Sequence, residues 1–282
     1  MNLIDFILNL AGVLLWLNWR SNRLDPLARA TPATLVGTIK RTEPTKLVRW
    51  RFLIFVALLV FVRAFFYVEI GPAVNWVPKL DLGAIVLVFH ANSFKQQLLF
   101  SSLSLLRALV IFYFWLIALA VINRPTANPD PLQKLLLLQI GKIARWPLWL
   151  KLLTPVITIG LLWLAFYPLL ANMGIINWAS SRTHLAGQCL VIGMGVFFSL
   201  KYLLLAILIL HLISSYIYLG ANPLWEFVST TARNLLPFPL SIGKVDLAPL
   251  LGIAIIVVLL FYPLPGTIRF LLGKFHLTLW PG

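Results

Sequence analysis

The sequence predicts an all-α, polytopic membrane protein with about six transmembrane crossings, arranged as three helix–interfacial helix–helix units. Its composition is the first reason: apolar residues make up 61% of the 282 residues and charged residues only 11%, whereas soluble domains have about 45–50% and about 25%. The second is length, because windows such as 52–68, 103–122 and 247–264 approach or reach the roughly 18–20 apolar residues that span a bilayer. The third is an internal repeat.

A short motif recurs three times, each time between two apolar stretches. Its copies are Asp25-Pro26-Leu27, Asp130-Pro131-Leu132 and Asn222-Pro223-Leu224. Each second apolar stretch contains an aromatic pair, namely Phe66-Tyr67, Phe166-Tyr167 and Phe261-Tyr262. A period of about 95–100 residues suits a membrane hairpin repeated within one chain. We therefore divide the chain into three units, at 1–80, 81–175 and 176–282.

The first apolar segment, residues 3–17, resembles a secretory signal in length. It has no basic stretch before it, and Asp5 stands there instead, while Arg20, Arg23 and Arg29 follow it. That order favours a retained membrane anchor with its N-terminus outside.

Basic residues predict the orientation of the loops. The net charge is +15, and the three segments that hold the motif copies contain fourteen Lys and Arg residues, against four in the three segments between them. Because loops rich in Lys and Arg stay in the cytoplasm, all three motif segments are expected there. A basic cytoplasmic face also predicts contact with anionic lipid headgroups, and nothing in the sequence predicts binding to nucleic acid.

Each motif is expected to begin a short helix that lies in the membrane interface. Proline suits the first helical position, and the Asp or Asn before it can cap the helix. Apolar residues recur at helical spacing in 131–146 and in 223–236, with polar residues on the other face. These helices either present a docking surface or seal the end of the helix bundle.

Two apolar runs, 81–122 and 185–219, are too long for one simple span. A helix of 35 residues covers about 52 Å at about 1.5 Å per residue, whereas the hydrocarbon core is about 30 Å thick. The charge count requires that each run crosses an odd number of times. A long tilted helix with an interfacial extension, or a span plus a re-entrant piece, would satisfy this requirement.

Residues 85–265 resemble the repeat of the YggT family. The resemblance lies in an apolar helix from Leu200-Lys201, then Asn222-Pro223, an amphipathic segment, a turn with Pro237 and Pro239, and Asp246-Leu247-Ala248-Pro249 before the last helix. The preceding repeat matches at Asn128-Pro129 and Thr154-Pro155, at a common offset of 94 residues. Leu152 stands where the last repeat has Asp246, and segment 1–80 looks like an extra unit.

The resemblance implies a location and a range of roles. Members of the family are bacterial inner-membrane or thylakoid proteins, linked with osmotic tolerance, cell division and, in plants, covalent haem attachment to a cytochrome. No enzymatic activity is established for them. The resemblance thus implies a multi-pass protein of the bacterial inner membrane, or alternatively of a thylakoid-type membrane, that is not an enzyme.

Chemistry-bearing residues are few. The sequence contains no phosphate loop, zinc-binding spacing or nucleophile motif, and its single cysteine is Cys189. Arg107 and Lys201 occupy equivalent places in long apolar runs and could line an anion pathway or bind a lipid phosphate. His211 lies in an apolar run and is a candidate haem ligand, although no cofactor is otherwise expected. Arg63, six residues before Glu69, is expected to snorkel outward near the end of its span.

Three functions remain open at this point. The first is a non-enzymatic scaffold or assembly factor that organises a membrane protein complex, with other membrane proteins as partners. The second is a small channel or transporter in osmotic or ion homeostasis, and the third is a haem-handling assembly factor for a cytochrome. The scaffold is preferred because the chain has little chemistry and has predicted interfacial helices.

Overall fold

The computed structural model describes residues 2–21, 46–123, 131–217, 222–236, 241–242, 245–246 and 248–261, with the single positions 266, 270 and 273. The chain divides into two compact units. The first comprises Met1–Leu80 and Val88–Leu109, and the second comprises Asp81–Leu87 and Val110–Gly282. Most of segments 81–175 and 176–282 therefore belongs to one unit.

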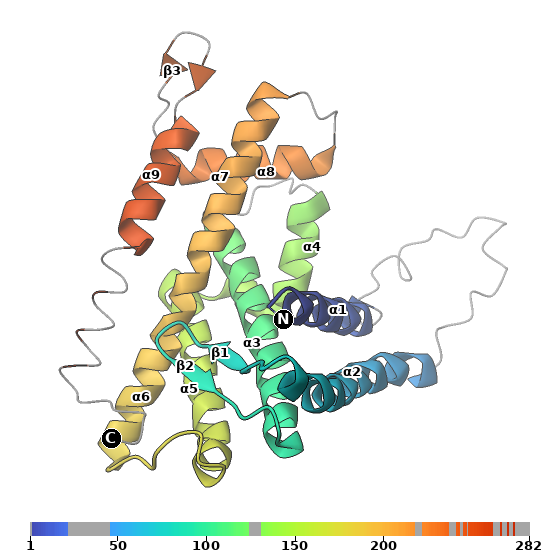
Figure 1. Ribbon diagram of the computed structural model, residues 1–282. Helices are drawn as coiled ribbons and strands as arrows, with labels where there is room; N and C mark the ends of the chain where they lie inside the picture. Colours follow the sequence, from blue (N-terminus) through green and yellow to red (C-terminus); the bar gives the residue numbers. More distant parts are fainter. Residues whose placement is uncertain are drawn as a thin grey trace, which may run out of the picture. The chain divides into compact units, whose positions relative to one another are not determined.

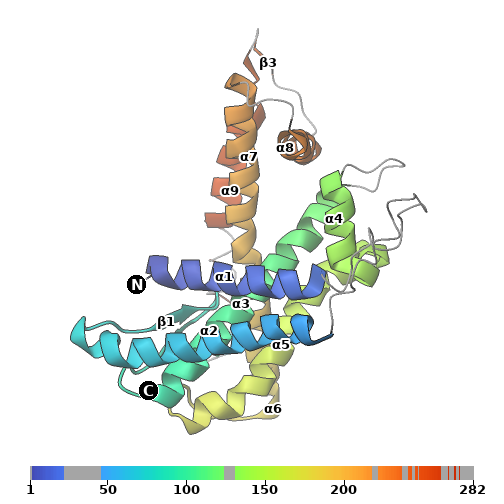
Figure 2. The same cartoon turned by 90° about the vertical axis from the view of Figure 1, so that its right-hand side faces the viewer.

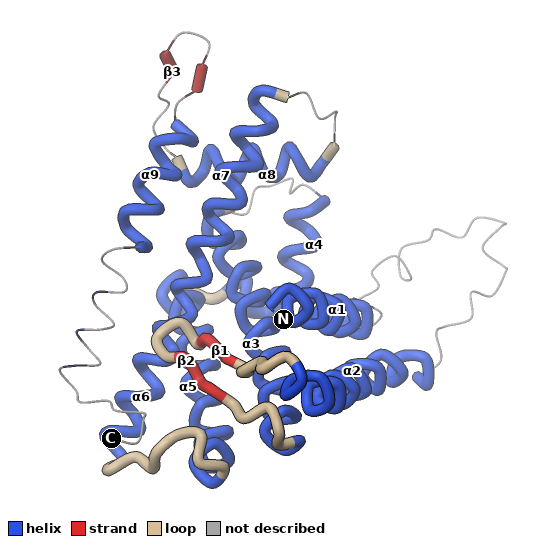
Figure 3. Tube along the Cα trace, viewed as in Figure 1, coloured by secondary structure: helices blue, strands red, loops and turns tan. Residues whose placement is uncertain are grey.

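Among the described residues, five helical segments are long and apolar enough to cross a membrane. They are α1 (Asn2–Ser21), α2 (Lys46–Ala73), α3 (Phe94–Ile122), α5 (Leu148–Asn172) and a composite segment of α6 (Arg182–Met194), the 3₁₀-helix η4 (Gly195–Ser199) and α7 (Leu200–Tyr216). Helices dominate the tube drawing in Figure 3. The predicted fold class, an all-α protein with several membrane-spanning helices, is confirmed.

In the first unit, α1 and α2 lie side by side (Figures 1 and 2). Gly12 of α1 lets this helix approach α3, because a Cβ atom there would lie 2.5 Å from a methyl group of Leu105. Aromatic rings pack beside α2. Tyr67 of α2 and Trp76 pack edge to face, with their ring centroids 4.6 Å apart. Phe100 of α3 packs against both rings and is almost fully buried.

A short β-hairpin precedes α3, formed by β1 (Lys79–Asp81) and β2 (Val86–Val88). No strand was predicted here from the sequence. The run 81–122 consists of most of this hairpin followed by one helix. Its turn is held by Asp81, whose side chain accepts a hydrogen bond from the backbone N–H of Gly83 at 2.7 Å. Gly83 has φ +85°, a left-handed conformation that favours glycine.

In the second unit, α5 and α6 form a close pair that depends on small residues. A Cβ atom on Gly193 would lie 2.6 Å from the backbone oxygen of Val156, and one on Gly160 would lie 3.3 Å from that of Cys189. Lipid tails are as apolar as the helix surfaces, so the hydrophobic effect gives little attraction between helices in a membrane. Close backbone approach provides van der Waals contact instead.

Helix α7 is flanked by α8 (Pro223–Leu235) and α9 (Ala248–Phe261). Figure 2 shows α8 nearly end-on beside α7, so the two helices cross steeply. Their shared core contains Leu203, Ile207, Leu208 and Ala232, together with Ala118 of α3. A second cluster joins α3 to α4 (Pro131–Ile140), which also contacts α8. The two expected interfacial helices thus pack against the bundle and against each other.

The composite segment α6–η4–α7 is interrupted where the hairpin turn meets it. A Cβ atom on Gly195 would lie 2.4 Å from the backbone oxygen of Leu82, and one on Gly83 would lie 2.4 Å from that of Gly195. Five residues of 3₁₀-helix, Gly195–Ser199, follow this contact. The run 185–219 is therefore a single interrupted helical segment, which is compatible with one crossing.

Helix α9 lies where the last crossing is expected, and a second strand pair precedes it. Strands β3 (Ser241–Ile242) and β4 (Val245–Asp246) pair in antiparallel fashion. The apolar window in α9, Pro249–Val258, is shorter than a full span. A sixth crossing and the threefold repeat remain predictions.

Replacement of Gly193 by alanine is expected to loosen the α5–α6 pair. The new methyl group would meet backbone rather than the end of a flexible side chain, and such overpacking costs about 1–3 kcal/mol. The thermal midpoint of the detergent-solubilised protein should fall for Gly193→Ala. Gly266→Ala is the control, since no described residue lies within 4 Å of a Cβ atom there. Equal midpoints for both variants would contradict the close contact.

Candidate functional site

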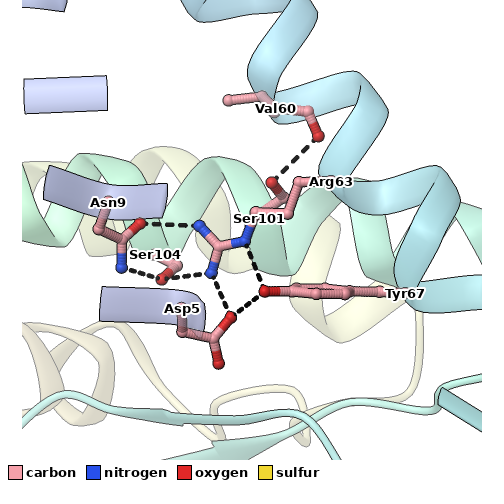
Figure 4. A network of polar contacts seen from close by, with 7 residues as sticks. All are labelled: Asp5, Asn9, Val60, Arg63, Tyr67, Ser101 and Ser104. Atoms are coloured by element: carbon pink, nitrogen blue, oxygen red, sulfur yellow. Dashed lines mark hydrogen bonds and ion pairs between the residues drawn. The ribbon is translucent and has the colours of Figure 1, made fainter. Parts of the chain in front are cut away.

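Arg63 lies in the middle of α2 and is only 2% exposed. The expectation that it snorkels outward is wrong, because its guanidinium turns inward and is held by side chains from three helices (Figure 4). A charged residue within a membrane span is costly in lipid and is a functional-site candidate by default. We therefore take the cluster around Arg63 as the candidate site.

Four hydrogen bonds from Arg63 use three of its nitrogen atoms. Nη2 forms an ion pair with Asp5 Oδ1 at 2.8 Å and also donates to Ser104 Oγ at 3.2 Å. Nη1 donates to Asn9 Oδ1 at 2.7 Å, and Nε donates to the Tyr67 hydroxyl at 3.2 Å. The planar fork of arginine can reach several acceptors at once in a way that a lysine ammonium cannot.

The acceptors are also bonded to one another. The Tyr67 hydroxyl donates to Asp5 Oδ1, and Asn9 Nδ2 donates to Ser104 Oγ at 2.9 Å. The result is a closed network that joins α1, α2 and α3 (Figure 4). We call these five residues the Arg63 cluster: Asp5, Asn9, Arg63, Tyr67 and Ser104.

Aromatic rings complete the surroundings of the guanidinium. Its carbon lies 5.3 Å from the ring centre of Tyr67 and 5.5 Å from that of Phe100. Both distances fall within the range of cation–π attraction. Beside the cluster, Ser101 Oγ donates to the backbone oxygen of Val60 at 3.1 Å and ties α3 to α2.

Helical spacing brings these residues together. Asp5 and Asn9 are four residues apart on α1, and Arg63 and Tyr67 are four residues apart on α2. Residues four apart share one helix face, so each helix presents a polar pair to the other. This matching pattern of polar pairs is visible in the sequence, but the prediction for Arg63 considered that residue alone and so did not include the cluster.

The cluster is suited to holding helices rather than to chemistry on a substrate. The ion pair contributes no net charge, and within it Arg63 is buried while Asp5 has 17% of its side chain exposed. Within the described part of the chain, no group of three or more His, Cys, Asp or Glu residues could hold a metal ion. The arrangement acts as a polar clamp that fixes α1 on α2 and α3.

A second polar cluster lies where α3 ends. Asn123 Nδ2 donates to Thr231 Oγ1 at 2.7 Å, and Asn234 Nδ2 donates to Asn123 Oδ1 at 3.0 Å. Gln133 of α4 reaches the backbone oxygen of Asn123 at 3.5 Å. Thr231 is fully buried and also donates to the backbone oxygen of Phe227. These bonds fix α8 and α4 to the end of α3.

The two candidate pathway residues belong to different compact units. Arg107 is partly buried in α3, in the first unit. Lys201 is partly buried in the first turn of α7, in the second unit, with Nζ 5.0 Å from the ring centre of Tyr202. That both residues line one pathway stays a prediction.

The candidate haem ligand His211 is 7% exposed and lies in α7. Its backbone oxygen accepts hydrogen bonds from Ser214 and Ser215, both at 2.9 Å. His184 lies in α6 on the same composite helical segment, 27 residues earlier. At about 1.5 Å per residue the two are about 40 Å apart along that segment, so they are not a ligand pair for one haem.

Most of the described motif residues lie at helix starts, and Asp246 lies in a strand. Asn222 caps α8 by accepting a hydrogen bond from the Leu224 N–H at 3.0 Å, and Pro223 is the first helical residue. Pro131 begins α4. Asp246 lies in β4, and Pro249 is buried in the first turn of α9. Asp25, Pro26 and Asp130 lie outside the described residues.

No protein-family model matches the chain, and no curated protein or solved structure does. The resemblance to the YggT family consequently stays a prediction that rests on the quoted motifs.

Breaking the ion pair from one side is expected to destabilise the first unit strongly. Arg63→Leu or Asp5→Leu leaves a buried or half-buried charge without its partner, at a cost of about 3–5 kcal/mol. The double variant should lose less than the sum of the two single losses, and unfolding midpoints in detergent measure this coupling. Arg51→Leu, at an exposed position of α2, is the control. Additive losses would contradict a coupled pair.

Adjacent threonines on α8 provide a matched test of the second cluster. Thr231→Val removes the bond to Asn123 while keeping the side-chain shape, and should cost about 1–3 kcal/mol because it leaves a buried amide unsatisfied. Thr230→Val changes an exposed position and should leave stability nearly unchanged. Thermal unfolding of both variants checks this, and an equal response of the two positions would argue against the buried bond.

Proposed function

We propose that this chain is a non-enzymatic membrane scaffold or assembly factor, in the bacterial inner membrane or a thylakoid-type membrane. The observation that supports this proposal best is the Arg63 cluster. The two charges of the cluster form an ion pair between packed helices. The guanidinium donates four hydrogen bonds, all of them to side chains of this protein. A site of this kind stabilises architecture and leaves little freedom for turnover.

Helices α4 and α8 supply the surface that a partner protein would meet. Their inner faces are used by the fold, since Gln133 and Leu136 of α4 and Val228 of α8 are buried. Leu135 and Leu224, by contrast, are 57% and 45% exposed. Apolar side chains held outward on rigid, well-packed helices suit contact with another membrane protein.

The channel and haem proposals receive less support. The channel proposal rests only on the equivalent places of Arg107 and Lys201 in the two repeats. A haem protein needs a ligand partner for His211, and the histidine on its own composite segment is far along the helix axis.

Site-specific crosslinking is the direct test of the scaffold. A photoreactive phenylalanine analogue at Leu135 or Leu224 should give one or two discrete protein adducts in native membranes. The same analogue at Leu161, which is 60% exposed in the apolar segment of α5, is the control and should give none or only diffuse products. Equal adduct patterns at all three positions would count against a defined partner on α4 and α8.

Ion flux separates the scaffold from the channel. The purified protein in liposomes should show no flux above empty liposomes. Flux that disappears in both Arg107→Ala and Lys201→Ala would replace the scaffold by the channel.

A further inference from the structure

The segment between α4 and α5 carries a pair of cations on one side. It is the 3₁₀-helix η3 (Gly141–Arg145), which holds Lys142 and Arg145. In a 3₁₀-helix the side chains at i and i+3 lie above one another, so the side chains of Lys142 and Arg145 project from the same face. Both are exposed, and Lys134 of α4 adds a third exposed cation earlier in the same segment.

Nothing in the described part of the chain neutralises these cations. Lys142 and Arg145 form no ion pair or hydrogen bond with the described residues. The stretch 131–217 contains six Lys and Arg residues and no Asp or Glu. Glu226 on α8 is exposed and makes no ion pair with described residues. The face of η3 is therefore available to an anionic partner.

Large apolar and aromatic side chains follow the cations directly. Trp146, Leu148 and Trp149 are 40%, 59% and 62% exposed. Leu148 is the first residue of α5 and of its candidate membrane span. If the hydrocarbon core begins at the start of this candidate span, Trp146 and Trp149 come at the depth where tryptophan is enriched, between headgroups and acyl chains.

The opposite face of η3 is anchored in the protein. Ile143 and Ala144 pack against a cluster formed by Ile117, Ala120, Leu136 and Ile140. This packing fixes the segment, so the cations and tryptophans are displayed on a constant surface rather than on a free loop. Rigid display lowers the entropic cost of binding.

We propose that η3 and the first turn of α5 form a binding surface for anionic phospholipid headgroups. The shared chemistry is a phosphate diester with a net negative charge, which Lys142 and Arg145 recognise, while Trp146 and Trp149 take the glycerol and upper acyl region. A membrane lipid is the occupant because this cationic face lies within one turn of a candidate membrane span and beside exposed tryptophans. The proposal holds whether or not the protein is a scaffold.

Lipid binding to the purified full-length protein tests this surface. Native mass spectrometry in a neutral detergent would compare dioleoyl-phosphatidylglycerol with dioleoyl-phosphatidylcholine. The wild type should bind the anionic lipid more tightly. The double variant Lys142→Gln/Arg145→Gln should bind it about thirtyfold more weakly, because each cation near an anionic surface contributes about a factor of five. Its affinity for the zwitterionic lipid should not change.

The control removes the same charge elsewhere. Lys79 and Arg182 are exposed cations outside this surface, and Lys79→Gln/Arg182→Gln should keep the preference for phosphatidylglycerol. Lys142→Arg/Arg145→Lys should restore it. Unfolding midpoints should be equal in all of these proteins, since the exchanged side chains of η3 contact no described partner.

Three results would overturn the proposal. The first is equal phosphatidylglycerol affinity in the wild type and the Lys142→Gln/Arg145→Gln variant. The second is displacement of the lipid by millimolar glycerol 3-phosphate, which would indicate a site for a free phosphate ester. The third is displacement by a polyglutamate peptide with an affinity above that of the lipid, which would indicate an acidic protein segment as the occupant.

Discussion

A guanidinium within an apolar helix must find its hydrogen-bond acceptors in the protein, because the hydrocarbon core offers no water. Arg63 therefore sets a requirement that α1 and α3 have to meet. Asp5 and Asn9 on α1 and Ser104 on α3 supply the acceptors, and the Tyr67 hydroxyl closes the ring of bonds. The close contact of Gly12 with Leu105 follows the same need, since α1 must lie near α3 for Asn9 to reach Ser104.

The second unit is assembled by contacts of other kinds. Backbone approach at Gly160 and Gly193 joins α5 to α6, and the hairpin turn meets the helix interruption through Gly83 and Gly195. One polar cluster, around Asn123, then fixes α8 at the end of α3. Because apolar burial gives little net attraction between helices in lipid, short-range packing and a few buried polar bonds have to provide the specificity.

Much of the fold can be predicted from hydropathy and helix-start chemistry, since both act locally. Apolar length predicts the spanning helices, and Asn222 before Pro223 predicts where α8 begins. The Arg63 cluster depends on residues 54 and 58 positions apart in the chain, which local rules do not pair. The β-hairpin was missed for a related reason: strands of three residues carry too short a pattern, and their turn depends on the close approach of Gly195.

The positions of the cations explain why a count of charges could not distinguish their roles. Arg63 is buried and forms an ion pair with Asp5, so its positive charge is neutralised within the protein. Lys142 and Arg145 stand on a surface whose opposite face is packed and whose own face has no acidic neighbour within 131–217. A net charge of +15 includes both kinds. Lys142 and Arg145 lie at the edge of a candidate membrane span, where we propose that they attract lipid headgroups.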